Sequence, residues 1–322
     1  MKRLSTALVS CLALSCISIE AGAQAWPTKP IKAVVAFPAG GIVDVLARVV
    51  CDQLSPQLRQ PIIVENRTGA GGIVAAAFVA KSDPDGHTLL THSAAHTIAP
   101  SLQPNLNYDP ARDFSAVIPL GVTANVLVVS PTRGFKTVRD LVAAAKAKPG
   151  SLNFASAGTG SGTHLSAERF RLSAGIEVVH VPFRGTPEMI TELIAGRIDF
   201  FLGPVGIVLP HIREGQLLAL AVNSPKRASP LPNVPTMTEA GLVDAEYPNW
   251  FGFFFPAKTP RDIVNRLHGE TSKSLQAPNV VSKLATLGID PMVLSPAEFD
   301  EYVKAEVAIN AALVKATGVK PN

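Results

Sequence analysis

AFPAGGIVDVLAR, residues 36–48, is the stretch that decides the fold of this chain. It overlaps the apolar run IKAVVAF (residues 31–37), which is typical of a parallel strand buried on both faces. The apolar residues after Gly40 and Gly41 have the spacing of one helix face: Val43, Leu46, Ala47, Val50 and Leu54. The stretch therefore predicts a strand, a tight turn and a helix whose N-terminus points into open space, a geometry that binds anions.

Short β-rich runs alternate with helical patterns along the rest of the chain. A strand at residues 61–67 is followed by a glycine-led helix at 69–81 and a third strand at 87–92. The pattern restarts with strands at 124–131 and 152–158, each followed by a helical segment. This alternation favours an α/β fold with a doubly wound sheet in each of two units.

Two segments are the natural crossings between the units: FSAVIPLGVTANV (114–126) and YPNWFGF (247–253). We therefore expect a discontinuous first lobe made of residues 26–125 and 251–322, and a second lobe made of residues 126–250. The helical C-terminal part of the chain would then pack back on the first lobe.

Helix signals mark the C-terminal part. Thr259 is the expected N-cap of a helix, with Pro260 at its first helical position. A last helix is predicted from about Pro296 to Lys315.

The N-terminus has the organisation of a secretory signal. Lys2 and Arg3 form a short positive start, and an apolar run from Leu4 to Ile19 follows. The small residues Ala23 and Ala25 end the segment, so we expect cleavage after Ala25 and export to the periplasm. The apolar run is short and contains several serines, which disfavours the alternative of a transmembrane helix.

Cysteine content follows from that cleavage. Cys11 and Cys16 lie in the signal, where a lipid anchor is a weaker alternative to the small-residue cleavage site. Cys51 alone remains in the mature chain, so no internal disulfide forms. We expect Cys51 to be a buried, inert thiol rather than a nucleophile.

Composition excludes some functions. The chain is 47% hydrophobic and 17% charged, with a formal net charge of +4, which is typical of a protein with sizeable cores. Its basic residues are scattered and not interleaved with aromatic residues, so no nucleic-acid surface is expected.

Three glycine-rich turns follow predicted strands: Gly40-Gly41, GAGG (69–72) and GTGSG (158–162). None fits G-x-G-x-x-G, and none is followed by the lysine of a P-loop, so nucleotide binding is not supported. Each turn can be a simple chain reversal. Because one such turn lies in each lobe, two helix N-termini could instead hold an anion with two negative ends.

Four side chains near these features have a structural and a binding interpretation. Asp44 suits the first turn of its helix, as a cap or as the partner of a ligand ammonium. Asp199 is expected to be buried, with a structural hydrogen bond or a cleft role. Arg184 either pairs with a carboxylate or is a solvated turn residue, and His164 either donates to a ligand or caps locally.

Catalytic and metal chemistry find little support. GTGSG is not the G-x-S-x-G nucleophile elbow, and no pair of carboxylates stands out. His87, His92 and His96 suggest a metal site, but His87 and His92 are five apart on a strand and point to opposite faces. No metal site is therefore expected.

Five ordered segments carry a family resemblance: FPAGGIVDVLAR, VENRTGAGG, DPDGHTLL, HVPFRGTPEMITELIAGRIDF and LPNVPTMTEAG. They resemble the Bug-type (TctC-like) extracytoplasmic receptors of tripartite tricarboxylate transporters over nearly all of the mature chain. The resemblance implies a periplasmic two-lobed clamshell of type II with two crossing strands. It also implies a monomer that uses no cofactor, performs no chemistry and delivers a di-, tri- or aromatic carboxylate to a membrane permease.

The resemblance also implies a set of ligand-binding residues, largely through backbone N–H groups and waters. Together with Asp44, the candidates are Pro38, Ala39, Gly40, Gly41, Thr159, Gly160, Ser161, His164, Arg184, Gly185 and Asp199.

Two positions depart from the family pattern. Many relatives have Thr or Ser where this chain has Val43, and Tyr where it has Phe183. Each change removes a hydroxyl near the expected site, which favours a less polar carboxylate. Two rival functions are a receptor that feeds a sensor kinase and an exported enzyme that acts on a carboxylate.

Overall fold

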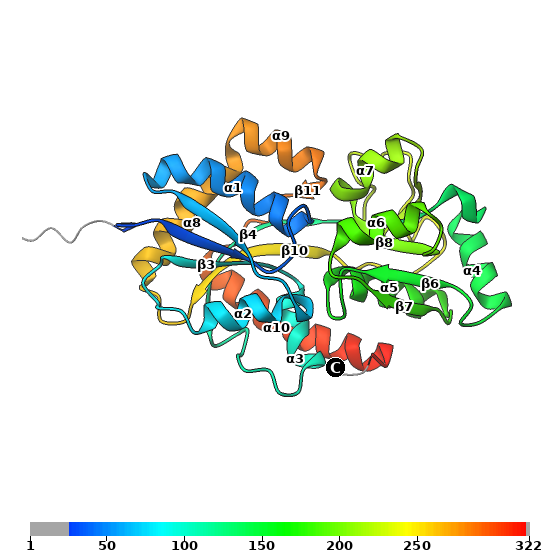
Figure 1. Cartoon of the computed structure of the whole chain (residues 1–322), viewed down its shortest axis with the longest axis horizontal. Helices are drawn as coiled ribbons and strands as arrows, with labels where there is room; N and C mark the ends of the chain where they lie inside the picture. Colours follow the sequence, from blue (N-terminus) through cyan, green and yellow to red (C-terminus); the bar gives the residue numbers. More distant parts are fainter. Residues whose placement is uncertain (1–25, 320–322) are drawn as a thin grey trace, which may run out of the picture.

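Two α/β lobes lie side by side along the long axis of the molecule (Figure 1). The computed structural model describes residues 26–319, so the predicted signal and its cleavage site lie outside the described residues. Each lobe has its own sheet with helices on both faces, which confirms the predicted α/β class. Within residues 26–319, every helix is too short or too polar to cross a membrane.

The first lobe contains a six-stranded sheet in the order β11-β4-β10-β3-β1-β2. Its strands are β1 (Ile31–Val35), β2 (Ile62–Asn66), β3 (Thr88–Ser93), β4 (Phe114–Thr123), β10 (Asn249–Pro256) and β11 (Ile289–Asp290). Its helices are α1 (Ile42–Leu58), α2 (Ile73–Ala80), α3 (Ala95–Leu102), α8 (Arg261–Gln276), α9 (Pro278–Thr286) and α10 (Pro296–Thr317), with a 3₁₀ turn η1 (Ala70–Gly72). Strand β1 is parallel to β2 and β3, whereas β10 is antiparallel to its neighbours β3 and β4.

The second lobe contains a five-stranded sheet in the order β7-β6-β8-β5-β9. Its strands are β5 (Asn125–Val129), β6 (Asn153–Ser156), β7 (Val179–Pro182), β8 (Phe200–Pro204) and β9 (Leu218–Val222). Its helices are α4 (Val138–Ala147), α5 (Gly162–Ala174), α6 (Thr186–Ile194) and α7 (Val205–Arg213), with a 3₁₀ turn η2 (Pro131–Arg133). Strand β6 is parallel to β7 and β8, so the turns after β6 and β7 lie at the same edge of the sheet.

The lobes are joined where β4 runs into β5 and where the chain returns through β10 (Figure 1). A further link is helix α10, which packs against α3 of the first lobe and α5 of the second. Within that contact, Asn310 accepts a hydrogen bond from the Tyr247 hydroxyl at 2.8 Å and donates one to Thr97 at 2.9 Å. The C-terminal helix therefore contacts both lobes beside the segments that join them, which we call the hinge.

Both sheets are covered by apolar side chains. In the first lobe one continuous core surrounds β1, α1 and β10, and includes Val34, Leu46 and Phe253. In the second lobe two separate cores lie around Phe200 and Phe201, consecutive residues of β8 that point to opposite faces. Such continuous burial explains why the central strands read as unbroken apolar runs.

Two local predictions need comment. Helix α8 begins at Arg261 with Pro260 as its N-cap, so the prediction that Thr259 caps it is wrong. The Thr259 hydroxyl instead donates to the Pro256 carbonyl at 2.8 Å, because a local turn competes for it. Cys51 is buried and is unpaired within the described residues, which confirms the predicted burial, and this burial raises the pKa of its thiol to about 12.

Candidate ligand site between the lobes

The turn between β1 and α1 presents an open helix N-terminus. Gly40 has φ +79°, a left-handed conformation that glycine adopts without strain, and Gly41 is the N-cap of α1. Gly41 donates its N–H to the Pro38 carbonyl at 3.2 Å, which closes the turn. Within residues 26–319 no side chain caps α1, so its first-turn N–H groups are available to an anion.

Asp44 supports this turn from behind. Its buried carboxylate accepts hydrogen bonds from the Gly40 N–H at 3.0 Å, from Arg48 at 3.0 Å and from the Asn66 amide at 2.9 Å. Burial by itself raises the pKa of Asp44, but the bonds from Arg48, Gly40 and Asn66 lower it below its ordinary value overall. The same Asn66 amide donates to the Phe37 carbonyl at 2.9 Å, so the network fixes both sides of the turn.

The turn between β6 and α5 has the same outline in the second lobe but is capped. Ser161 is the N-cap of α5, and its hydroxyl accepts from the His164 N–H at 3.2 Å. His164 Nδ1 in turn accepts from the Gly160 N–H at 3.2 Å, so its ring is neutral and carries its proton on Nε2. Thr163 accepts from the Ala157 N–H at 3.0 Å.

A stacked ring lies behind this second turn. The rings of His164 and His180 are 4.0 Å apart between centroids, and His180 contacts the Ser156 hydroxyl at 2.6 Å. Burial, with a smaller contribution from His180, lowers the pKa of His164 to about 3. Burial lowers the pKa of His180 to about 4. Both rings are therefore neutral near pH 7 and support the turn without charge.

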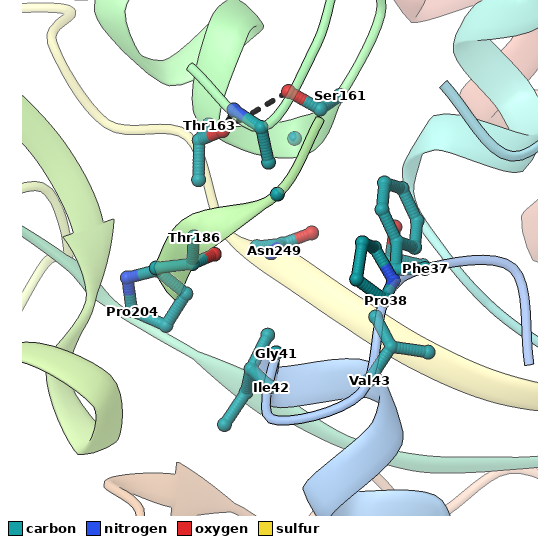
Figure 2. A pocket seen from close by; sticks show the side chains of 14 residues that line it. Phe37, Pro38, Gly41, Ile42, Val43, Ser161, Thr163, Thr186, Pro204 and Asn249 are labelled. Atoms are coloured by element: carbon teal, nitrogen blue, oxygen red, sulfur yellow. Dashed lines mark hydrogen bonds between the residues drawn. The ribbon is translucent and has the colours of Figure 1, made fainter. Parts of the chain in front are cut away.

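A cavity of about 30 Å³ lies where the two turns meet (Figure 2). The first lobe contributes Phe37, Pro38, Gly41, Ile42, Val43 and Ser93 to its walls. The second lobe contributes Ala157, Ser161, Gly162, Thr163, Gly185 and Thr186, with Pro204 at the end of β8. Asn249, at the start of β10, lies between the two sets. No lining residue has a charged side chain, so backbone and hydroxyl groups supply the polarity.

A larger, more polar cavity of about 510 Å³ adjoins it and shares Phe37, Pro38 and Ala157. The turn of residues 68–72 lines one side, and Thr159 and Arg184 line the other. At Gly71, with φ +65°, an added Cβ would lie 2.8 Å from the Thr159 carbonyl oxygen. The glycine-rich turns of the two lobes therefore touch, and the outer cavity opens beside that contact.

The predicted site residues divide into three groups. Pro38, Gly41, Ser161 and Gly185 line the inner cavity. Pro38 also lines the outer cavity, with Thr159 and Arg184. The remaining candidates line neither cavity: Ala39, Gly40, Asp44, Gly160, His164 and Asp199.

Among these six, Asp199 lies away from the cavity, directly before β8, whereas Pro204 at the other end of β8 lines it. The buried Asp199 carboxylate accepts from the Asn153 N–H at 2.8 Å and pairs with Arg133. Gly40, Gly160 and His164 instead position the turns through the bonds described above.

Sequence reasoning missed several lining residues, of which Asn249 and Ser93 are the most polar. Both lie at strand ends that meet at the hinge, since Ser93 pairs with Phe251, two residues after Asn249. The only sequence signal is a polar residue at the boundary of an apolar run, a pattern too common to single them out.

His92 and His96 are buried with their ring centroids 5.2 Å apart. Burial lowers the pKa of His92 to about 4 and that of His96 well below its ordinary value. No group of three His, Cys, Asp or Glu residues within 26–319 is arranged to hold a metal ion.

Comparison with solved structures defines the class of protein. Rpa4515 of R. palustris, solved with adipate, matches with a TM-score of 0.88 and 33% identity, covering 92% of this chain and 100% of that one. MatC (Rpa3494) from Rhodopseudomonas palustris, with bound malate, matches with a TM-score of 0.85 and 31% identity, covering 90% and 100%. The chain is a two-lobed periplasmic binding protein.

The family follows from sequence matches. The model of the tripartite tricarboxylate transporter family receptor matches residues 46–319. Protein BugT of Bordetella pertussis is 34% identical over 322 residues, which covers 99% of each chain. The chain therefore belongs to the tripartite tricarboxylate transporter receptor family, whose members are periplasmic solute-binding receptors and not enzymes. The predicted family, fold class and non-enzymatic role are confirmed.

Proposed function

We propose that this receptor binds a small di-, tri- or aromatic carboxylate in the cleft between its lobes. The observation that carries the proposal is the meeting of two helix N-termini, those of α1 and α5, at one cavity. Helix N-termini bind anions through free N–H groups and the helix dipole. The N-terminus of α1 is the stronger candidate because no side chain of the described residues caps it.

The chemistry of the walls supports a carboxylate with an apolar middle. Phe37, Ile42, Val43 and Pro204 offer apolar surface to a carbon chain, and the N–H groups at the start of α1 suit carboxylate oxygens. Charge-assisted hydrogen bonds of this kind are roughly twice as strong as neutral ones. The two related structures named above hold adipate and malate, both dicarboxylates.

We further propose delivery to the membrane permease of a tripartite transporter by a monomeric receptor. Residues 1–25 would direct export and be cleaved after Ala25. Closure of the lobes would exclude water from the acid and complete the surface that the permease recognises.

A thermal-shift screen of the mature chain, residues 26–322, tests the ligand class. An acid at 100 times its dissociation constant adds about 2.7 kcal/mol of apparent stability. We expect a shift with at least one mono-, di- or tricarboxylate, aromatic acids included. No shift with any of them would contradict the proposal, and turnover of a bound acid would favour an enzyme.

Ile42→Pro tests the helix N-terminus directly. Ile42 is the first residue of α1, where proline fits the backbone but lacks the N–H, and Gly41 (φ −74°, ψ 161°) tolerates a following proline. We expect ligand affinity to fall at least about tenfold by calorimetry. Val138→Pro is the matched control, because Val138 is a buried residue at the start of α4, remote from the cavity. Equal effects of the two substitutions on ligand affinity would contradict a role of the α1 N-terminus in binding.

A further inference from the structure

Asn249 has a buried amide oxygen with no hydrogen-bond partner among the described residues. It begins β10 at the hinge, is 4% exposed and lies between the two lobes at the inner cavity (Figure 2). Its Oδ1 is buried and forms no hydrogen bond with any residue of 26–319. Asn223, also at the hinge, shows the contrast: its amide accepts from the Asn125 N–H at 2.7 Å and donates to Ser166 and Tyr247.

An unpaired amide in such a place is costly unless something binds it. A buried polar group without a partner destabilises the folded chain, because it loses its hydrogen bonds to water. A structural asparagine would be expected to resemble Asn223, with its amide satisfied by the protein. Gly162 approaches so closely that an added Cβ would lie 2.5 Å from Asn249 Oδ1, so that side of the amide is closed. Asn249 also lines the inner cavity, so a group bound there lies beside this residue.

The amide selects among ligand groups by their hydrogen-bonding chemistry. A carboxylate only accepts, so it would pair with the amide N–H and leave Oδ1 unpaired. An ammonium donates to Oδ1, but no charged side chain lines the cavity to balance it. A hydroxyl both donates and accepts, so it satisfies the amide in either of its two orientations.

We propose that Asn249 is a specificity-determining residue that hydrogen-bonds a hydroxyl group on the carbon chain of the bound acid. The preferred ligand is then a small hydroxycarboxylic acid rather than its deoxy analogue. This inference rests on the proposed function, since it assumes that a carboxylate is held at the helix N-termini beside Asn249. It adds the chemical group that distinguishes one acid from another.

Matched acids that differ by one hydroxyl test the proposal. Affinities of the mature wild-type chain are measured by calorimetry for each enantiomer of malate against succinate, and for citrate against tricarballylate. Wild type should prefer the hydroxy acid of at least one pair by about tenfold or more, as expected when a site hydrogen-bonds a substrate hydroxyl. In Asn249→Leu, which is similar in volume, that preference should fall to within about twofold.

Thermal stability separates a binding role from a structural one. Because the buried Asn249 Oδ1 has no partner within residues 26–319, Asn249→Leu should leave the Tm of the ligand-free chain unchanged or raise it. Asn153→Leu is the matched control, since Asn153 bonds Asp199 and Arg197 outside the cavity. That control should lower the Tm and keep the preference for the hydroxy acid.

Three outcomes would overturn the proposal. Equal binding of hydroxy and deoxy acids by wild type would reject hydroxyl recognition while leaving the carboxylate receptor intact. A lower Tm with unchanged preference in Asn249→Leu would make Asn249 structural. Binding of no acid at all would reject both this inference and the proposed function.

Discussion

The two glycine-rich turns at the cavity look alike in sequence but are built differently. The turn of the first lobe is held by the bond from the Gly40 N–H to the charged Asp44, and no side chain within residues 26–319 caps α1. The turn of the second lobe is held by the neutral ring of His164, and Ser161 caps α5. One lobe leaves its helix donors free for an anion, whereas the other uses part of its donors internally.

The difference in helix capping suggests that the two lobes contribute differently to ligand binding. Since the Asp44 carboxylate is buried and paired, the turn can hold its shape while the N–H groups of α1 bind a ligand. At α5, Ser161 and Thr163 are engaged in bonds within the turn, so fewer donors remain for a second carboxylate. We infer that the charge of the acid binds mainly at α1 and that the second lobe recognises its shape.

Asp44→Ala should have the largest effect on this comparison. Its loss leaves the Gly40 N–H and one N–H of the Asn66 amide without their acceptor, which should lower the free energy of unfolding by about 2 kcal/mol and ligand affinity by more than about tenfold. Denaturant melts and calorimetry measure both. Asp140→Ala, in the first turn of α4, is the control and should leave affinity unchanged. Unchanged ligand affinity in Asp44→Ala would show that the hydrogen bonds of Asp44 do not support ligand binding.

The second-largest expected effect is a loss of stability in acid, caused by the buried histidines behind the second-lobe turn. The folded chain keeps His164 and His180 neutral with pKa values of about 3 and 4, whereas unfolded histidine titrates near pH 6.5. The unfolded state therefore binds more protons below about pH 6.5, so stability falls as pH drops from 6.5 toward 4. His164→Asn removes one titrating ring, and its loss of Tm between pH 7 and pH 4 should be smaller than that of wild type.

The half-buried His211 on α7 supplies the control for that measurement, because it lies outside the turn. His211→Asn should retain the full acid sensitivity of wild type. If His164→Asn and His211→Asn behave identically, His164 does not contribute to the acid response.

Gly71→Ala should have a moderate effect, confined to closure of the lobes. An added Cβ would lie 2.8 Å from the Thr159 carbonyl oxygen of the other lobe. Gly134→Ala is closely matched, because Gly134 also has a left-handed φ, +77°, but no atom within 4 Å of an added Cβ. Both should lose about 1 kcal/mol of stability from backbone strain. Only Gly71→Ala should weaken ligand binding severalfold, and equal binding by both would argue against contact of the lobes at this turn.

Val43→Thr should have the smallest effect. Val43 is buried and lines the cavity from the first turn of α1, so threonine adds a hydroxyl in nearly the same volume. We expect a shift of about two- to fivefold in favour of the more polar acid of a matched pair, measured by competition calorimetry. A uniform change for all acids would contradict a role of Val43 in ligand choice.

The sequence predicted the turns well because their signals are local. Glycines between a strand and an amphipathic helix specify the β1–α1 and β6–α5 junctions almost alone. It placed Asp44 only as a helix cap or a ligand partner, because its bond to Asn66 joins residues 22 apart. Thr259 was misassigned as a cap for a related reason, since two local hydrogen-bonding patterns of nearly equal strength compete for one hydroxyl.

What the sequence alone determined about this protein is its architecture and family: alternating strand and helix periods, glycine turns at strand ends, and ordered motifs. What only the tertiary structure decided is which polar groups are already paired and which remain available. Asp199 is paired with Arg133 away from the cavity. Asn249 lies more than 200 residues along the chain from the first turn, yet it lines the cavity, and its buried Oδ1 has no partner among the described residues. Pairing depends on contacts between distant segments, and no local pattern encodes it.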